Sequence, residues 1–300
     1  MEENKMANAL DAYFPEIWAQ ESLQILRSNM VFGNLVHRDF ENIGASVGDT
    51  VNTRKPATFV VNDKTAGANV TIQDASATNV PVVLSNHKEV TFLIEDAEAT
   101  KSIKDLVNEY IEPAATAHAE AIDAAIAAEY ANAGATVAVG AAMSADAIVD
   151  ARKQLNDLKV PFQNRRLVLS SLAEADVLKD QNFVRADVFG DQGTALREAS
   201  LGRLYGFDIF TDQNIVQTTG TPNIDHNMAF HRNGISLVTR PLKSAASNNV
   251  RIATLSFEGF GLRVVTGYNI DRLGAQTTVD ILYGIKTLDA NLVVSVDTNA

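Results

Sequence analysis

The longest regular pattern of apolar and polar positions covers residues 100–134 and predicts one long helix. At 100° per residue, its apolar side chains form one alanine-rich arc from Ile103 to Ala128. At 1.5 Å per residue this helix would be about 50 Å long, close to the diameter of a compact globule of this size. We therefore expect a spine that crosses the whole molecule. The opposite face carries an acidic and polar stripe, which either faces solvent or pairs with arginines of a neighbouring subunit: Asp105, Glu109, Glu112, Thr116, Glu120 and Asp123.

The ends of this helix can also be placed. Thr100 or Ser102 can cap the first turn, and Gly134 is expected to end the helix as a C′ glycine. Pro113 removes a backbone donor inside the pattern. Because the apolar arc keeps its phase across Pro113, we expect a kink there and not two separate helices.

An amphipathic arm precedes the spine at residues 7–40 and carries the one tryptophan of the chain, Trp18. Two interpretations are open. Trp18 can fix the arm onto its own core, or the arm can embrace a neighbouring subunit, because aromatic anchors are enriched at interfaces.

Short runs of strand-forming residues follow the arm, at 51–54, 58–62, 70–74 and 80–84. Residues 55–79 are poor in large apolar side chains and rich in Thr, Ala, Asn and Asp. Such a hairpin cannot bury enough apolar surface to stay against the body. We expect it to project and to order against another molecule.

The chain after the spine mixes helices and strands. Ser144 is expected to cap a helix that ends near residue 158, and Ser171 to begin another after a strand at 165–170. The last fifty residues are nearly all of strand type and are expected to return to the spine helix, which predicts an α+β fold with a discontinuous domain. Further strands are predicted at residues 204–211, 228–230, 235–238, 250–269, 276–286 and 288–296.

Composition narrows the chemistry. The 300 residues are 46% hydrophobic and include no cysteine, which excludes disulfides, thiolate metal sites and cysteine nucleophiles. The formal net charge of −12 has the wrong sign for gripping a phosphate backbone over a broad surface. The sequence has no run of 18 apolar residues, so no transmembrane helix is expected. The polar start of the chain does not have the pattern of a secretory signal.

Candidate sites give no catalytic or metal constellation. His118 with Glu120, and His226 and His231 near Asp225, do not supply three ligands at the spacing that zinc requires. Residues 259–261 read Gly-Phe-Gly without a third glycine, which favours a close approach of strands over a dinucleotide loop. We expect no catalytic residue, no cofactor and no metal.

Three stretches in a fixed order carry a resemblance to a known family. The first is residues 7–54 with Glu16-Ile17-Trp18-Ala19, the second is residues 201–235 with Leu204-Tyr205-Gly206-Phe207, and the third is residues 262–284 with Val264-Val265-Thr266-Gly267-Tyr268. Together they resemble the major capsid proteins of tailed phages, most closely the P22 coat-protein-like branch of the HK97 fold. The specificity lies in their order and spacing, because no single stretch is diagnostic.

The resemblance implies a division of the chain. It gives an N-terminal arm at 1–53, an extended E-loop at 54–85, a peripheral domain at 86–143 and 251–300 that includes the spine, and an axial domain at 144–250. The chain departs from the P22 coat protein in having no room for that protein's extra inserted domain. It also lacks the N-terminal coiled coil that serves some relatives as a scaffold, so a separate scaffolding protein is the expected partner.

The resemblance also implies a function. The expected protein is not an enzyme but a coat protein that assembles through hexamers and pentamers into an icosahedral shell around phage DNA. It would assemble in the host bacterial cytoplasm with a scaffolding and a portal protein, and would bind neither a membrane nor a DNA sequence. Two alternatives stay open: an encapsulin-like nanocompartment shell, and a monomeric hydrolase using paired carboxylates. The residues expected at subunit contacts are Phe14, Trp18, Arg54, Phe59, Lys64, Asp105, Glu109 and Glu112.

Overall fold

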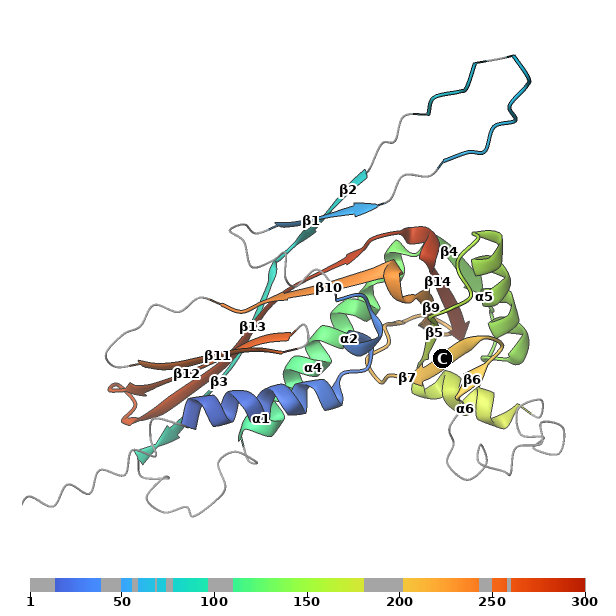
Figure 1. Ribbon diagram of the computed structural model, residues 1–300. Helices are drawn as coiled ribbons and strands as arrows, with labels where there is room; N and C mark the ends of the chain where they lie inside the picture. The colour runs from blue at the N-terminus through green and yellow to red at the C-terminus, as the bar shows by residue number, and fades with distance from the viewer. Residues whose placement is uncertain are drawn as a thin grey trace, which may run out of the picture.

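The computed structural model has two sheets arranged one after the other along a central helix, with a hairpin that projects away from both (Figure 1). The structure describes residues 14–38, 50–55, 59–67, 69–73, 78–96, 110–180, 202–242, 250–257 and 260–299. No helix in these ranges is long and apolar enough to cross a membrane.

The first sheet is antiparallel and has β13, the longest strand, at its centre. β13 pairs along one edge with β3 and along the other with β12 and then β10, while β11 extends the sheet beyond β12. The strand bounds are β3 (Asn86–Glu95), β10 (Ile235–Arg240), β11 (Val250–Phe257), β12 (Phe260–Asn269) and β13 (Gly274–Thr287).

The second sheet is mixed, in the order β4-β14-β9-β5-β7-β6, and β8 also pairs with β9. Its two parallel pairs are β4 with β14 and β5 with β7. Helices α5 (Ala145–Asp157) and α6 (Ser171–Lys179) belong to this lobe (Figure 1). The strand bounds are β4 (Ala135–Ala138), β5 (Arg165–Leu169), β6 (Arg203–Leu204), β7 (Phe207–Thr211), β8 (Gln217–Thr218), β9 (Ile224–His231) and β14 (Val293–Asn299).

Two predicted helix starts in this lobe are confirmed, and both follow from side-chain capping. Ser144 accepts a hydrogen bond from the backbone N–H of Ala147 at the start of α5. Ser170 does the same for Ala173 at the start of α6. Each serine satisfies one of the backbone donors that a helix leaves free at its first turn.

Two helices cover one face of the first sheet. α1 (Phe14–Asn29) packs on β11, β12 and α4 (Glu112–Ala127), and α4 also packs on β13 (Figure 1). A short helix, α2 (Phe32–Leu35), follows α1 and also contacts α4. The predicted return of the late strands to the spine is confirmed for β13: Tyr283 donates to the carbonyl oxygen of Ala121 at 3.3 Å.

The spine differs from its prediction at both ends. Pro113 lies in the first turn of α4, where a missing N–H is tolerated, and residues 100–109 lie outside the described ranges. After Ala127 the chain continues as a 3₁₀ turn, η3 (Ala128–Asn132). Gly134 is not a C′ cap, because Ala133 before it is already extended. A Cβ at Gly134 would lie 2.5 Å from the carbonyl oxygen of Ala290, so close packing requires the glycine.

The buried face of α4 also differs from the predicted arc. Ala117 and Ala128, placed in the apolar arc, are exposed, whereas Asp123, placed in the acidic stripe, is 1% exposed. The reason is that α4 is covered on two sides, by the sheet and by α1 with α2. One apolar stripe in the sequence does not reveal such a double coverage.

Two predicted strands in the projecting segment are wrong. Residues 59–62 and 70–73 are extended but not paired in a sheet. Only its base is a hairpin, in which β1 (Thr50–Lys55) pairs antiparallel with β2 (Thr78–Val83). Further along the chain, the polar sequence of residues 180–200 with Gly190 and Gly193 predicts a long exposed loop, and all but residue 180 of it lies outside the described residues.

The sheets exchange strands across the predicted domain boundaries. β10, from the segment assigned to the axial domain, belongs to the first sheet, and β14, from the segment assigned to the peripheral domain, belongs to the second. The boundaries at 144 and 250 therefore do not separate the sheets. The division into arm, loop, peripheral and axial domains stays a prediction.

Three connections between the lobes meet at one junction. β9 leads to β10 through η4 (Arg232–Gly234), β13 leads to β14 through η5 (Ala290–Leu292), and η3 leads from α4 to β4. Backbone hydrogen bonds tie these connections together: Gly134 donates to Ala290 at 2.9 Å, and Leu288 donates to Gly234 at 2.8 Å.

A single methyl group tests how tightly the base of the hairpin is seated. A Cβ at Gly284 of β13 would lie 2.4 Å from the carbonyl oxygen of Val83 in β2. We expect Gly284→Ala to lower the free energy of unfolding by about 1–3 kcal/mol, because backbone must move to admit the methyl group. Urea unfolding measures the change. Ser85→Ala at an exposed neighbouring position is the control, and equal stability of both variants would contradict the close approach.

Candidate assembly surface

The projecting hairpin and its extension carry exposed apolar side chains. Beyond β1 and β2 the two legs of the loop run out into solvent, away from both sheets (Figure 1). Val61 is 95% exposed and Ile72 is 87% exposed, values that are unusual for residues which normally lie inside. The other large apolar side chains exposed on the legs are Phe59, Val60 and Val70.

A side-chain clamp joins the two legs where no strand ladder does. The Gln73 amide accepts from the backbone N–H of Val60 at 2.9 Å and donates to the carbonyl oxygen of the same residue. One glutamine thus substitutes for a pair of backbone hydrogen bonds. At the tip, Gly67 adopts a φ of +80° in the turn, which a residue without Cβ reaches at no steric cost.

The base of the hairpin is anchored in the body. Val51 and Val82 are buried in a small cluster with Leu84 and Val238 of β10. Thr53 donates to the carbonyl oxygen of Val80 at 2.6 Å across the hairpin. The base of the loop is therefore held in the body, while its apolar side chains are exposed further out.

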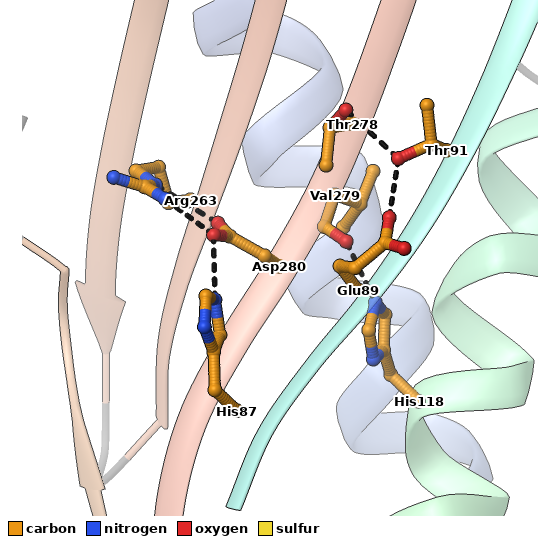
Figure 2. A network of polar contacts seen from close by, with 8 residues as sticks. All are labelled: His87, Glu89, Thr91, His118, Arg263, Thr278, Val279 and Asp280. Atoms are coloured by element: carbon orange, nitrogen blue, oxygen red, sulfur yellow. Dashed lines mark hydrogen bonds and ion pairs between the residues drawn. The ribbon is translucent and has the colours of Figure 1, made fainter.

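The face of the first sheet opposite α1 and α4 carries a polar network (Figure 2). Asp280 of β13 is 3% exposed and accepts from Arg263 of β12 through both carboxylate oxygens, one contact being 2.9 Å. His87 of β3 lies 3.0 Å from the same carboxylate. The hydrogen bond to Asp280 raises the pKa of Arg263, so this guanidinium stays charged. A separate polar group on the same face joins Thr91 and Thr278, whose hydroxyl groups are 2.9 Å apart (Figure 2).

The histidines that the sequence singled out have structural contacts. His118 is buried on α4, and its Nε2 lies 3.0 Å from the carbonyl oxygen of Val279 (Figure 2). Burial lowers the pKa of His118, which favours the neutral ring. His226 lies between Asp297 and Thr218, each 2.8 Å from one ring nitrogen. Within the described ranges, no three His, Asp or Glu residues gather as metal ligands.

The predicted contact residues fall into three groups. Phe59 and Lys64 lie exposed on the projecting loop, and Glu112 is exposed in the first turn of α4. Phe14 and Trp18 are in α1 and Arg54 is in β1, but their side chains lie outside the described part of the structure. Asp105 and Glu109 lie outside the described residues altogether.

Over the described residues the arm packs on its own subunit, and its expected contact with a neighbouring subunit stays a prediction. Leu23 and Leu26 of α1 and Phe32 of α2 belong to the main hydrophobic core. His37 then exchanges backbone hydrogen bonds with β10, donating to Ile235 and accepting from Leu237, each at 3.0 Å.

Sequence reasoning missed the buried carboxylates. Asp280 and Arg263 occur inside apolar strand runs. A charged residue in such a run is either exposed on the outer face of the sheet or paired, so their positions could have indicated an ion pair. Asp123 gave no such signal, because its place in the helix matched the polar stripe.

Comparisons with solved structures identify the fold. The chain is similar to a structure from Mycobacterium phage Che8, with 26% sequence identity, a TM-score of 0.69, and coverage of 89% of this chain and 90% of that one. It is also similar to the acid-stable capsid of Helicobacter pylori bacteriophage KHP30, with 10% identity, a TM-score of 0.65, and coverage of 90% and 92%.

A third similar structure is not described as a phage. It is a virus-like particle from Pyrococcus furiosus, with 11% identity, a TM-score of 0.53, and coverage of 94% of this chain and 99% of that one. No protein-family model matches the sequence, and no curated protein matches it significantly.

The chain therefore has the HK97-like α+β capsid fold, and the resemblance to tailed-phage major capsid proteins is confirmed at the level of the fold. The similar solved structures are structural shell proteins and not enzymes. The P22 coat-protein-like branch stays a prediction.

The Arg263–Asp280 pair makes a testable contribution to stability. We expect Arg263→Met to lower the free energy of unfolding by about 3 kcal/mol, because it leaves the Asp280 carboxylate buried with only His87 beside it. Adding Asp280→Leu should recover much of the loss, since an apolar pair pays no desolvation of charge. Urea unfolding measures both, with exposed Arg272→Met as the control. A double variant as unstable as Arg263→Met would contradict this account.

Proposed function

We propose that this protein is the major capsid protein of a tailed phage. Its copies assemble through hexamers and pentamers into a closed icosahedral shell that encloses double-stranded DNA. One observation carries the proposal beyond the fold: a rooted, projecting loop exposes apolar side chains that a single subunit cannot bury. In a shell, each loop can lie on the next subunit, and many such contacts add up around a closed surface.

The size of the apolar contribution supports this role. Fully burying a valine, isoleucine or phenylalanine side chain contributes roughly 1.5–3 kcal/mol relative to leaving it exposed. The loop exposes five such side chains, Phe59, Val60, Val61, Val70 and Ile72. Part of this gain offsets the ordering of the legs, so each contact is moderate and the shell depends on their number.

The predicted contact residues enter this proposal unequally. Phe59 and Lys64 are on the loop and Glu112 is exposed on α4, which suits contacts with a neighbouring copy. Phe14, Trp18, Arg54, Asp105 and Glu109 rest on the sequence alone, because their side chains lie outside the described part of the structure. We also propose the predicted division into arm, loop, peripheral and axial domains, with β10 belonging to the first sheet and β14 to the second.

The remaining partners follow from the same proposal. A scaffolding protein and a portal protein assist assembly in the host bacterial cytoplasm, and the finished protein resides in the virion. The net charge of −12 would limit adhesion of the shell to the DNA it encloses. No sequence-specific DNA binding, membrane contact or cofactor is part of this role.

The loop can be tested without altering the fold. We expect the double variant Val61→Ser/Ile72→Ser to lose shell assembly, because it removes the two most exposed apolar side chains of the loop. The free energy of unfolding of the isolated subunit should change by less than about 0.5 kcal/mol, since neither side chain is packed. Negative-stain microscopy and size-exclusion chromatography measure assembly.

The matched control is Asn62→Ser/Thr71→Ser, which changes exposed polar positions on the same two legs and should still give shells. Normal shells from Val61→Ser/Ile72→Ser would refute the role of the loop. A stable monomer of the unaltered protein under all assembly conditions would instead favour the monomeric hydrolase.

A second candidate is a shell that encloses protein cargo, as in the encapsulin-like alternative. It is favoured by the similarity to the Pyrococcus furiosus virus-like particle, which covers nearly the whole of both chains. The contents of shells isolated from their natural source distinguish the two roles. Packaged DNA supports the phage capsid, and packaged enzymes support the compartment.

A further inference from the structure

Two carboxyl groups meet inside the molecule where three of its parts join. Asp123 belongs to α4, and Asp212 follows β7 of the second sheet; they are 1% and 4% exposed. Their carboxyl groups lie within hydrogen-bonding reach of each other. The third part is the arm, which passes over Asp123 between α1 and α2.

Asp123 holds the arm through its backbone. Its Oδ2 accepts from the N–H of Val31 at 2.7 Å, and its Oδ1 accepts from the N–H of Gly33 at 2.9 Å. These two donors begin the short helix α2, so the carboxyl group replaces partners that the turn would otherwise lack. The side chain is therefore the polar attachment of the arm to the spine helix.

Asp212 is satisfied on one oxygen only. Its Oδ1 accepts from the backbone N–H of Asn214 at 2.8 Å and from the Asn214 amide at 2.9 Å. Its Oδ2 is buried and accepts no hydrogen bond from any described residue. Two buried carboxylates without a cation between them repel, and one proton shared between them removes that repulsion and supplies the missing donor.

Among the described side chains, Asp212 is the one whose charge acts on Asp123. Arg166 of β5 instead donates to the carbonyl oxygen of Leu35, further along the arm. Glu129 accepts from Thr287. Other charged or titratable side chains described on the neighbouring elements include Glu112, His118 and Glu120 on α4, His37 and Arg38 on the arm, Arg165 on β5, Asp208 on β7, Asp225, His226 and His231 on β9, Arg232 after it, and Asp280 and Lys286 on β13.

We propose that Asp123 and Asp212 form a proton-operated latch, which fastens the arm to its own subunit while they share a proton and loosens it when both are ionised. On loosening, the proton passes to solvent and the N–H groups of Val31 and Gly33 lose their acceptor. The latch itself does not depend on the proposed function. That a loosened arm becomes available to a neighbouring copy does rest on it.

The direction of the pH effect follows from the buried state. Burial first, and then the charge of Asp212, raise the pKa of Asp123 to about 7, although the two backbone N–H groups oppose this. When the arm is loose, the exposed carboxyl group has its ordinary pKa of about 3.9. At a pH between these two pKa values, the carboxyl group is protonated while the arm is fastened and loses the proton when the arm loosens. Rising pH therefore favours opening up to about pH 7 and has little further effect above it.

Hydrogen exchange of the full chain tests the latch directly. Protection of the amides in the segment holding Val31 and Gly33, corrected for intrinsic exchange, should fall about a hundredfold between pH 5 and pH 7 and then level off. Asp212→Asn should flatten this profile to less than about tenfold, because its amide donates permanently where the proton was shared. Its remaining oxygen can still accept from Asn214.

Asp225→Asn is the matched control. Asp225 is 5% exposed, but its oxygens accept from Ser170 and Gln217 and it does not touch the arm, so the profile of the arm should stay that of the unaltered protein. A flat profile in the unaltered protein, or a hundredfold change retained in Asp212→Asn, would overturn the latch. A profile that shifts on adding a chelator would also overturn it, because a metal ion would then join the pair. Failure of shell assembly bears only on the proposed function.

Discussion

The structure depends on the burial of one face of the first sheet beneath α1 and α4. Most side chains of β12 and β13 that point to this face are apolar, and the core they form includes Leu26 of α1 and Ile122 of α4. Burial of this surface is the dominant favourable term in folding, so it fixes the arm and the spine together. The described residues of the projecting loop contribute nothing to that core, and for this reason its exposed apolar side chains stay available to other molecules.

Polar groups inside the body are placed where elements cross. Asp280 joins three strands on the outer face of the first sheet, and Asp123 joins the arm to the spine on the inner side. Each replaces a contact that apolar packing cannot make, because backbone donors and buried charges need partners of definite geometry. These hydrogen bonds therefore fix how the arm, the spine and the strands are placed relative to one another, whereas apolar burial mainly holds them together.

The sequence predicted the fold class, the arm, the projecting segment and the start of α5, because each has a local signal. Ser144 is a cap that needs no knowledge of the rest of the chain, and the order of the parts carried the resemblance to capsid proteins. Which residues of α4 are buried, and the close packing of Gly134 against another segment, could not be predicted. Both depend on segments far away in sequence, which cover Asp123 and bring Ala290 against the glycine. The pairing of β10 and β14 with the opposite sheets is likewise a long-range property.

The junction of η3, η4 and η5 has a mechanical consequence. Because β10 of the first sheet, and β4 and β14 of the second, come from segments assigned to the other domain, covalent backbone runs three times through the same small region. Tension that pulls the two lobes apart is then carried by peptide bonds in parallel and not by side-chain adhesion alone.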